Sequence, residues 1–168
     1  EWHHDPVVKA GVPLIADMSS NFMSKPIEIE KYSMIYAGAQ KNVGPSGAVV
    51  VIMKKDFLAT AASGLPSMLD YNIHAKNGSM YNTPPCWTIY MIGLVLKWIE
   101  DMGGLTKVAT NNQVKAKYIY DAIDASNGFY KGTVVPEDRS LMNITFRMAT
   151  EELEALFISE AKKAGMIG

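Results

Sequence analysis

The sequence contains one cysteine among 168 residues, so no disulfide can form within the chain. A lone thiol, Cys86, fits a reducing compartment, and we expect a cytoplasmic protein. Neither sign of charge is in excess: 16 basic and 17 acidic residues give a net charge of −1, which argues against a nucleic-acid-binding surface. The longest apolar run, Ile89 to Leu96, is far too short to cross a membrane.

The chain also lacks an initiator methionine, and its first residues, "EWHHDP", do not resemble a signal peptide. We interpret the sequence as an internal piece of a longer protein. His3 and His4 lie side by side near its start, but such a pair is more typical of a surface than of a metal site, and we expect no bound metal. With 48% hydrophobic and 20% charged residues, the composition is that of an ordinary folded domain.

Three short runs rich in aliphatic residues predict strands. Their continuous apolar character is typical of α/β sheets covered on both faces. The first two are separated by a segment long enough for a crossover, so we expect them to be parallel. Only "NVGPSG" separates Lys41 from the third, which should therefore be antiparallel to the second. The predicted strands are Val12–Ala16, Ser33–Ala37 and Ala48–Met53.

Helices dominate the rest of the chain. Thr83 followed by two prolines predicts a capped helix start, and Gly103-Gly104 predicts its end. Thr150 predicts the cap of a last helix that ends at Gly165. The predicted elements are helices over 86–102, 106–125 and 151–165 and a strand over 142–148. We expect an α/β domain over residues 1–105, and a linking helix with the beginning of a smaller α+β domain over 106–168.

Asp17 and Lys41 each follow one of the two parallel strands, at the sheet edge where α/β folds bind ligands. Taken alone, Lys41 is more typical of a solvated residue at a strand end, and Asp17 is more typical of a turn residue or a helix cap. Taken together, they suggest a site for pyridoxal phosphate. A desolvated lysine has a lowered pKa and can form a Schiff base with this cofactor. A carboxylate such as that of Asp17 can keep the cofactor's pyridine nitrogen protonated. Ser19 and Ser20 are expected to line the loop after Asp17.

Several stretches together resemble the phosphoserine aminotransferase family, a class-V subgroup of pyridoxal-phosphate enzymes with the aspartate aminotransferase fold (fold type I). The resemblance covers nearly the whole chain. It is carried by "ADMSSNF", "YAGAQKNVGPSG", "PSMLDY", "NGSMYNTPP" and "RSLMNITFR", of which "AGAQKN" and "NTPP" are specific.

The resemblance implies a role for five residues. Lys41 would carry the cofactor, Asp17 would pair with its pyridine nitrogen, and Gln40 would contact its phosphate. Asn82 and Thr83 would reach the phosphate of a neighbouring subunit's cofactor, which implies a homodimer with shared sites. The reaction implied is reversible amino transfer between glutamate and 3-phosphohydroxypyruvate, giving O-phosphoserine and 2-oxoglutarate in serine biosynthesis.

The family's N-terminal half and its later segment that binds the substrate phosphate are not in this sequence, so we expect the chain alone to be inactive. Alternatives are a serine– or alanine–glyoxylate-type transaminase and a non-catalytic α/β module. A cysteine desulfurase fits less well, because Gln40 rather than histidine precedes Lys41. Cys86 begins a helix, where we expect a buried structural thiol.

Overall fold

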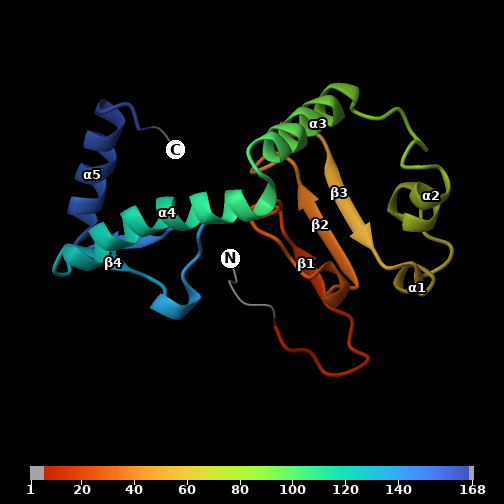
Figure 1. The fold of residues 1–168 in the computed structure, drawn as a ribbon, viewed down its shortest axis with the longest axis horizontal. Helices are drawn as coiled ribbons and strands as arrows, with labels where there is room; N and C mark the ends of the chain where they lie inside the picture. The colour runs from red at the N-terminus through yellow and green to blue at the C-terminus, as the bar shows by residue number, and fades with distance from the viewer. Residues whose placement is uncertain (1–5, 167–168) are drawn as a thin grey trace. The chain divides into compact units, whose positions relative to one another are not determined.

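The computed structural model describes residues 6–166, which form two compact units, 6–109 and 110–166. Figure 1 shows the order of their elements. The strands are β1 (Ile15–Asp17), β2 (Met34–Gly38), β3 (Val49–Met53), β4 (Tyr130–Gly132) and β5 (Phe146–Met148). The α-helices are α1 (Lys55–Leu58), α2 (Tyr71–Lys76), α3 (Cys86–Asp101), α4 (Gly104–Ala125) and α5 (Glu151–Lys163). No α-helix among these residues is long and apolar enough to cross a membrane.

The first unit contains a mixed sheet in the order β1-β2-β3 (Figure 1). β1 pairs with β2 in parallel, and β2 pairs with β3 antiparallel, which confirms both predicted directions. β1 begins three residues later than predicted. Val12 donates its backbone N–H to the carbonyl of Lys9 in a turn, and the Pro13 nitrogen carries no hydrogen to donate to a ladder.

One face of this sheet forms the core of the unit. Ala16, Ile35 and Ile52 stand opposite one another in the pairing and pack with loop residues such as Phe22 and Val43. On the other face Ile15 is 50% exposed and Val49 is 62% exposed. The prediction that these strands are covered on both faces is confirmed for β2, where Met34 and Ile35 are both buried. It is wrong for the edge strands in the part of the chain described, where Ile15, Val49 and Val51 are exposed.

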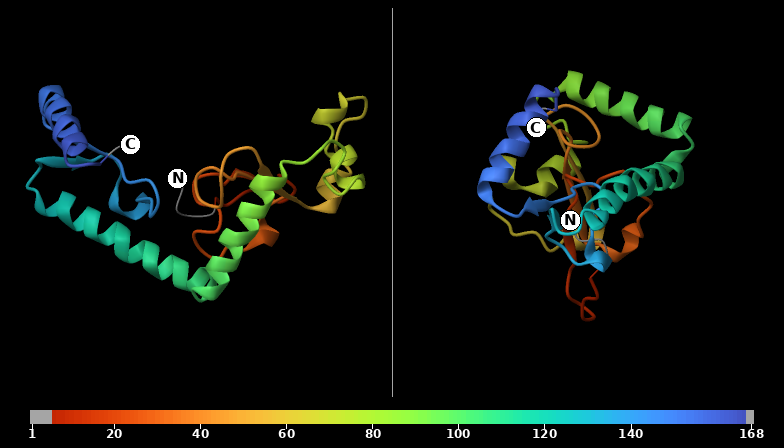
Figure 2. Two further views of the ribbon diagram at one scale, coloured as in Figure 1. Left: turned by 90° about the horizontal axis from the view of Figure 1, so that it is seen from above. Right: turned by 90° about the vertical axis from the view of Figure 1, so that its left-hand side faces the viewer.

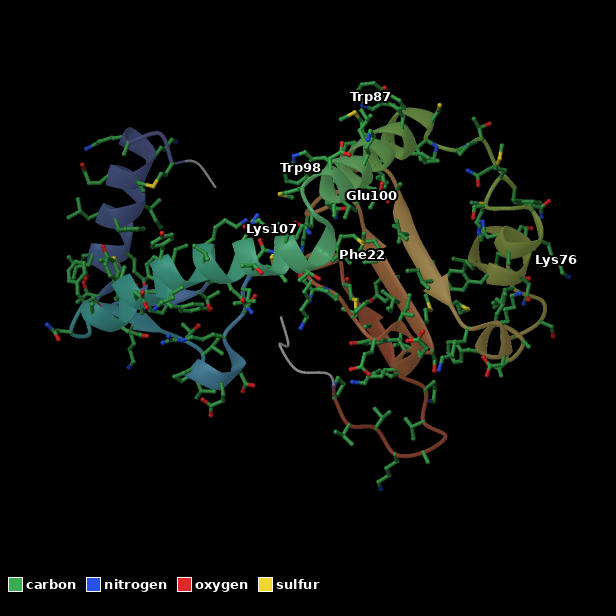
Figure 3. The ribbon with its side chains drawn as sticks, viewed as in Figure 1. Phe22, Lys76, Trp87, Trp98, Glu100 and Lys107 are labelled. Carbon is green, nitrogen blue, oxygen red and sulfur yellow. The ribbon has the colours of Figure 1, made fainter. Side chains whose placement is uncertain are left out.

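Helix α3 is apolar on two sides. Thr88 and Ile99 are buried, and Ile92 packs against the core. Trp87, 67% exposed, and Trp98, 61% exposed, project away from the strands (Figure 3). The inner side rests on the turn that follows β2, because the Thr88 hydroxyl donates a hydrogen bond of 3.1 Å to the carbonyl of Ser46. Helix α3 thus supports the loop that carries Lys41.

Gly44 marks the closest approach of this turn to α3. A Cβ added at Gly44 would lie 2.8 Å from Cγ1 of Ile92. We expect Gly44→Ala to lower the free energy of unfolding of the full-length protein by about 1–3 kcal/mol, because the helix and turn must separate. A shift of the urea midpoint measures this effect.

Gly93, on α3 itself, provides the matched control for that substitution. An added Cβ there meets nothing within 4 Å. Gly93→Ala should stabilise the helix by roughly 0.5–1 kcal/mol, since alanine has a higher helix propensity. Equal effects of the two substitutions would contradict the contact between the turn and α3.

The second unit contains the C-terminal part of α4, the antiparallel pair β4–β5, and α5, which packs on β5 (Figure 2). Edge-to-face ring contacts join Tyr130 of β4 to Phe146 of β5, and each of these to Phe157 of α5, with centroids 5.4–6.0 Å apart. The Thr150 hydroxyl accepts the backbone N–H of Leu153, which confirms the predicted cap. Aromatic packing therefore joins β4, β5 and α5 to one another.

β5 is shorter than the predicted strand over 142–148. The Ser140 hydroxyl accepts the backbone N–H groups of Met142 and Asn143, both at 3.0 Å. These donors are therefore engaged in a local serine turn and not in a strand ladder, a competition typical of serine. The partner strand β4 was not predicted at all.

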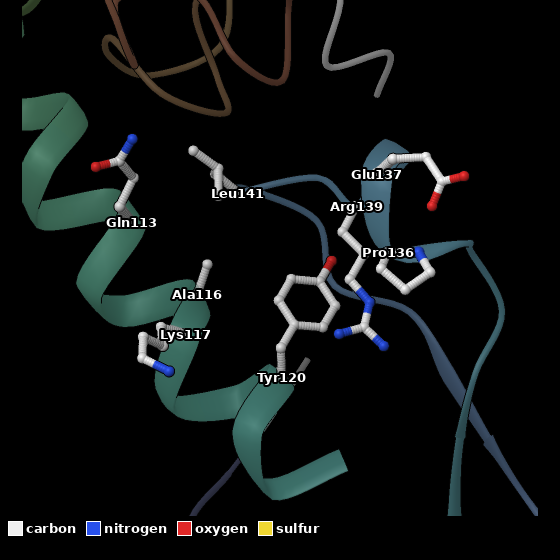
Figure 4. A pocket seen from close by; sticks show the side chains of 8 residues that line it. All are labelled: Gln113, Ala116, Lys117, Tyr120, Pro136, Glu137, Arg139 and Leu141. Carbon is white, nitrogen blue, oxygen red and sulfur yellow. The ribbon is translucent and has the colours of Figure 1, made fainter. Parts of the chain in front are cut away.

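A hollow of about 520 Å³ lies in the second unit between α4 and the segment before β5 (Figure 4). The Arg139 guanidinium lies 4.5 Å from the ring centroid of Tyr120 and makes two hydrogen bonds of 2.7 Å to the Asp124 carboxylate. The Arg139 guanidinium thereby lowers the pKa of Asp124. This arrangement stabilises the fold of the unit.

Candidate active site

Asp17 and Lys41 belong to adjacent connections at one edge of the sheet. Asp17 is the last residue of β1 and pairs with Tyr36 of β2. Because the strands are parallel, the loop after Asp17 and the turn after Gly38 leave the sheet at the same end. Lys41 lies in that turn, and its positive charge contributes to lowering the pKa of Asp17. The Lys41 amine is therefore near enough to the Asp17 carboxylate for its charge to act on it.

The turn after β2 is anchored by its small and apolar residues. The Ala39 carbonyl accepts the backbone N–H groups of Val43 and Gly44, at 3.2 and 2.9 Å. Ala39 and Val43 are almost completely buried. Gln40 and Lys41, which lie between these anchors, are exposed. The prediction that Lys41 is desolvated is thus wrong for the part of the chain described, because this compact turn directs its buried side chains to the core and leaves the lysine outside.

The Asp17 carboxylate has several partners. The Ser19 hydroxyl and the Ser19 backbone N–H, which donates to the carboxylate at 2.9 Å, lower the pKa of Asp17 most, against an opposing effect of burial. The Tyr36 hydroxyl lowers it further. Asp17 is therefore held as an anion, the state needed to pair with a protonated ring nitrogen.

Tyr36 was not singled out from the sequence, although it lies in the stretch that predicted β2. The signal was the register: paired residues of adjacent strands have side chains on the same face of a sheet, so the residue opposite Asp17 is its neighbour. Finding it required the pairing of the strands and not only their position in the sequence.

Two hydrogen bonds join the loop after β1 to the end of β2 and its turn. The Ser19 Oγ accepts the backbone N–H of Gly38 at 2.9 Å. The Asn42 side-chain amide donates to the Phe22 carbonyl at 2.6 Å. These bonds fix the loop that carries Asp17 against the turn that carries Lys41.

Asn82 and Thr83 lie in the irregular segment before α3, and both are exposed. The Asn82 amide donates to the Thr83 carbonyl at 3.2 Å. The prediction that Thr83 caps the helix with a proline in its first turn is wrong: Pro85 occupies the cap position and Cys86 begins the helix. Each residue before a proline avoids helical backbone, so the Pro84-Pro85 pair delays the start of α3.

Cys86 is exposed, so the prediction of a buried thiol is also wrong. His3 and His4 lie outside the described residues. Within residues 6–166, no group of three or more histidine, cysteine, aspartate or glutamate side chains is arranged to hold a metal ion.

The residues at the sheet edge fit pyridoxal phosphate by their chemistry. An anionic carboxylate and a primary amine at one sheet edge can engage, respectively, a basic ring nitrogen and an aldehyde. The amides of Gln40 and of the segment before α3 are donors of the kind that bind phosphate. This donor set is the observation on which the cofactor assignment rests.

Comparison with known proteins agrees with this chemistry. The profile of the aminotransferase class-V family matches residues 5–167. A phosphoserine aminotransferase of Lysinibacillus sphaericus is 60% identical over the whole chain. The chain spans 46% of that relative, and thus about half the length of the curated relatives it matches.

Two solved structures match closely. One, from a study of radiation damage of the Schiff base in phosphoserine aminotransferase, has a TM-score of 0.95 and 50% identity, and covers 100% of this chain and 46% of its own. The other is the phosphoserine aminotransferase of Trichomonas vaginalis with pyridoxal phosphate bound. It has a TM-score of 0.91 and 40% identity, and the match covers 100% of this chain and 48% of the Trichomonas chain. These matches confirm the predicted fold class, including the mixed sheet of the large domain.

Proposed function

The chain belongs to the aminotransferase class-V family, and from this we propose that it is part of a phosphoserine aminotransferase. The reaction is reversible amino transfer between glutamate and 3-phosphohydroxypyruvate, giving O-phosphoserine and 2-oxoglutarate in serine biosynthesis. The observation that carries the proposal is the meeting of Asp17 and Lys41 at one sheet edge, in a chain 60% identical to a protein of this name.

Pyridoxal phosphate, when bound, supplies an electron sink for the charge that develops at the amino acid's Cα. Lys41 would hold the cofactor through its amine and, once displaced by the substrate, would move the proton from Cα. The Asp17 carboxylate would keep the ring nitrogen protonated, and the Gln40 amide would donate to the phosphate. The position of Asp17 at the end of β1, and of Gln40 and Lys41 in the turn after β2, supports these roles.

Asn82 and Thr83 would bind the phosphate of a neighbouring subunit's cofactor, so the active form would be a homodimer. Their exposure and their place just before α3 leave both side chains accessible. The proposal further assigns residues 1–105 to the cofactor-binding large domain and 106–168 to the linking helix and an incomplete C-terminal domain. The single cysteine supports a cytoplasmic location.

Substrate preference tests the assignment. The full-length protein, supplied with glutamate, should use 3-phosphohydroxypyruvate at least about 100-fold better in kcat/KM than unphosphorylated hydroxypyruvate, because charge-assisted bonds to a phosphate are lost with the analogue. Equal use of the two would favour a serine– or alanine–glyoxylate-type transaminase. Borohydride reduction followed by peptide mapping should find the cofactor on Lys41. A protein that carries no cofactor there would support the non-catalytic alternative.

A further inference from the structure

Ser19 makes direct hydrogen bonds to both halves of the candidate site. On one side its backbone N–H donates to the Asp17 carboxylate at 2.9 Å, and its hydroxyl lowers the pKa of that carboxyl. On the other side its Oγ accepts the backbone N–H of Gly38, where β2 ends and the turn to Lys41 begins. A hydroxyl has one hydrogen to donate and two lone pairs to accept, so it can serve both partners at once.

We propose that Ser19 is the positioning residue of this site, which sets the orientation of the Asp17 carboxylate and its spacing from the Lys41 turn. The inference rests on the proposed function for its catalytic meaning, but the hydrogen bonds themselves are properties of this chain alone. Ser19 touches neither substrate nor cofactor in this scheme and acts through Asp17.

The geometry assigns this task to Ser19 and not to the loop in general. Asn42 also joins the two connections, through its 2.6 Å bond to the Phe22 carbonyl, yet it does not act on the carboxylate. Tyr36 and Lys41 are the other titratable groups that act on Asp17. Both side chains are still present in the Ser19 and Asn42 variants. The two cross-connections can therefore be tested separately.

The direct test is titration of the Asp17 carboxyl by carbon NMR in the full-length, cofactor-free protein. Ser19→Ala should raise the pKa of Asp17 toward the usual aspartate value, because the strongest stabilising hydrogen bond to the anion is lost. Ser19→Thr, which keeps the hydroxyl, should restore the wild-type titration. Asn42→Ala, which removes the other connection, should leave the titration of Asp17 unchanged.

In the cofactor-loaded protein, Ser19→Ala should lower kcat about tenfold with little change in KM, as expected when a hydrogen bond to a charged group is lost. An unchanged titration of Asp17 in Ser19→Ala, or an equal change in Asn42→Ala, would overturn the positioning role. If the Ser19→Ala protein does not fold, the titration of Asp17 in Ser19→Thr decides. A pKa of Asp17 in Ser19→Thr that differs from the wild type would then overturn the positioning role. Failure of the wild type to carry cofactor on Lys41 would refute the proposed function instead, and the NMR result would stand independently.

Discussion

Lys41→Ala should reduce kcat of the full-length protein by roughly 10³-fold or more, the largest effect expected of any substitution in this chain. In the proposed function the lysine would have two tasks, covalent attachment of the cofactor and transfer of the Cα proton, and a positioned acid–base group alone contributes about 10²- to 10⁴-fold. The variant should also lose the borohydride-stable bond to the cofactor. Steady-state kinetics and mass spectrometry of the reduced protein measure the two effects.

Two variants test the role of Lys41 more closely. Lys41→Arg keeps the positive charge but cannot lose its proton at neutral pH, so it should be as inactive as Lys41→Ala. Lys54 is the matched control, since it is also exposed and directly follows an apolar strand, β3. Lys54→Ala should retain activity. Substantial turnover by Lys41→Arg would show that the lysine serves only as a charge.

Asp17→Asn should lower kcat by roughly 10²- to 10³-fold. An ion pair between this carboxylate and a ring nitrogen would be worth on the order of a few kcal/mol at the effective dielectric typical of pairs near a protein surface, and about 1.4 kcal/mol corresponds to a factor of ten in rate. The neutral amide keeps the size of the side chain, removes the charge and replaces one acceptor oxygen with an NH₂ donor. The cofactor should still attach to Lys41, so the loss should appear in turnover and not in borohydride trapping.

The pH dependence of the wild type adds a second measure for Asp17. Its pKa is lowered chiefly by the hydrogen bonds from Ser19. The charge is therefore present at neutral pH and is lost only as the pH falls below the usual aspartate pKa of about 3.9. Wild-type kcat should show no acid limb from this group above about pH 5.

Asp56→Asn serves as the control for Asp17→Asn, because Asp56 is another exposed aspartate with a carboxylate that accepts a nearby backbone N–H. It should leave kcat unchanged. If Asp17→Asn were equally harmless, the pairing of Asp17 with the ring nitrogen would be wrong.

The sheet and the meeting of Asp17 with Lys41 could be predicted because connection lengths restrict strand direction. "NVGPSG" is too short for a crossover, and this alone required the antiparallel pair β2–β3. The parallel pair then brought residues 24 positions apart to one edge. These features depend on the lengths of the connections between strands and on the pattern of apolar residues, both of which can be read directly from the sequence.

Other features depend on tertiary contacts and were missed or wrong. β4 is three residues long, includes a lysine and a glycine, and exists because Tyr130 packs among aromatic rings supplied by β5 and α5. The exposure of Lys41 follows from the burial of Ala39 and Val43 on either side of it, which no periodicity revealed. The functional roles of all five predicted site residues stay predictions: Asp17, Gln40, Lys41, Asn82 and Thr83.

The support that α3 gives to the turn after β2 has a consequence for an assembled pair of subunits. The helix begins three residues after Thr83, proposed to serve the neighbour, and rests through Thr88 and Ile92 on the turn that holds its own subunit's lysine. In the proposed homodimer, a displacement of this one helix would therefore disturb two catalytic centres, one in each protomer. In a mixed dimer of one altered and one unaltered chain, neither centre would be fully intact.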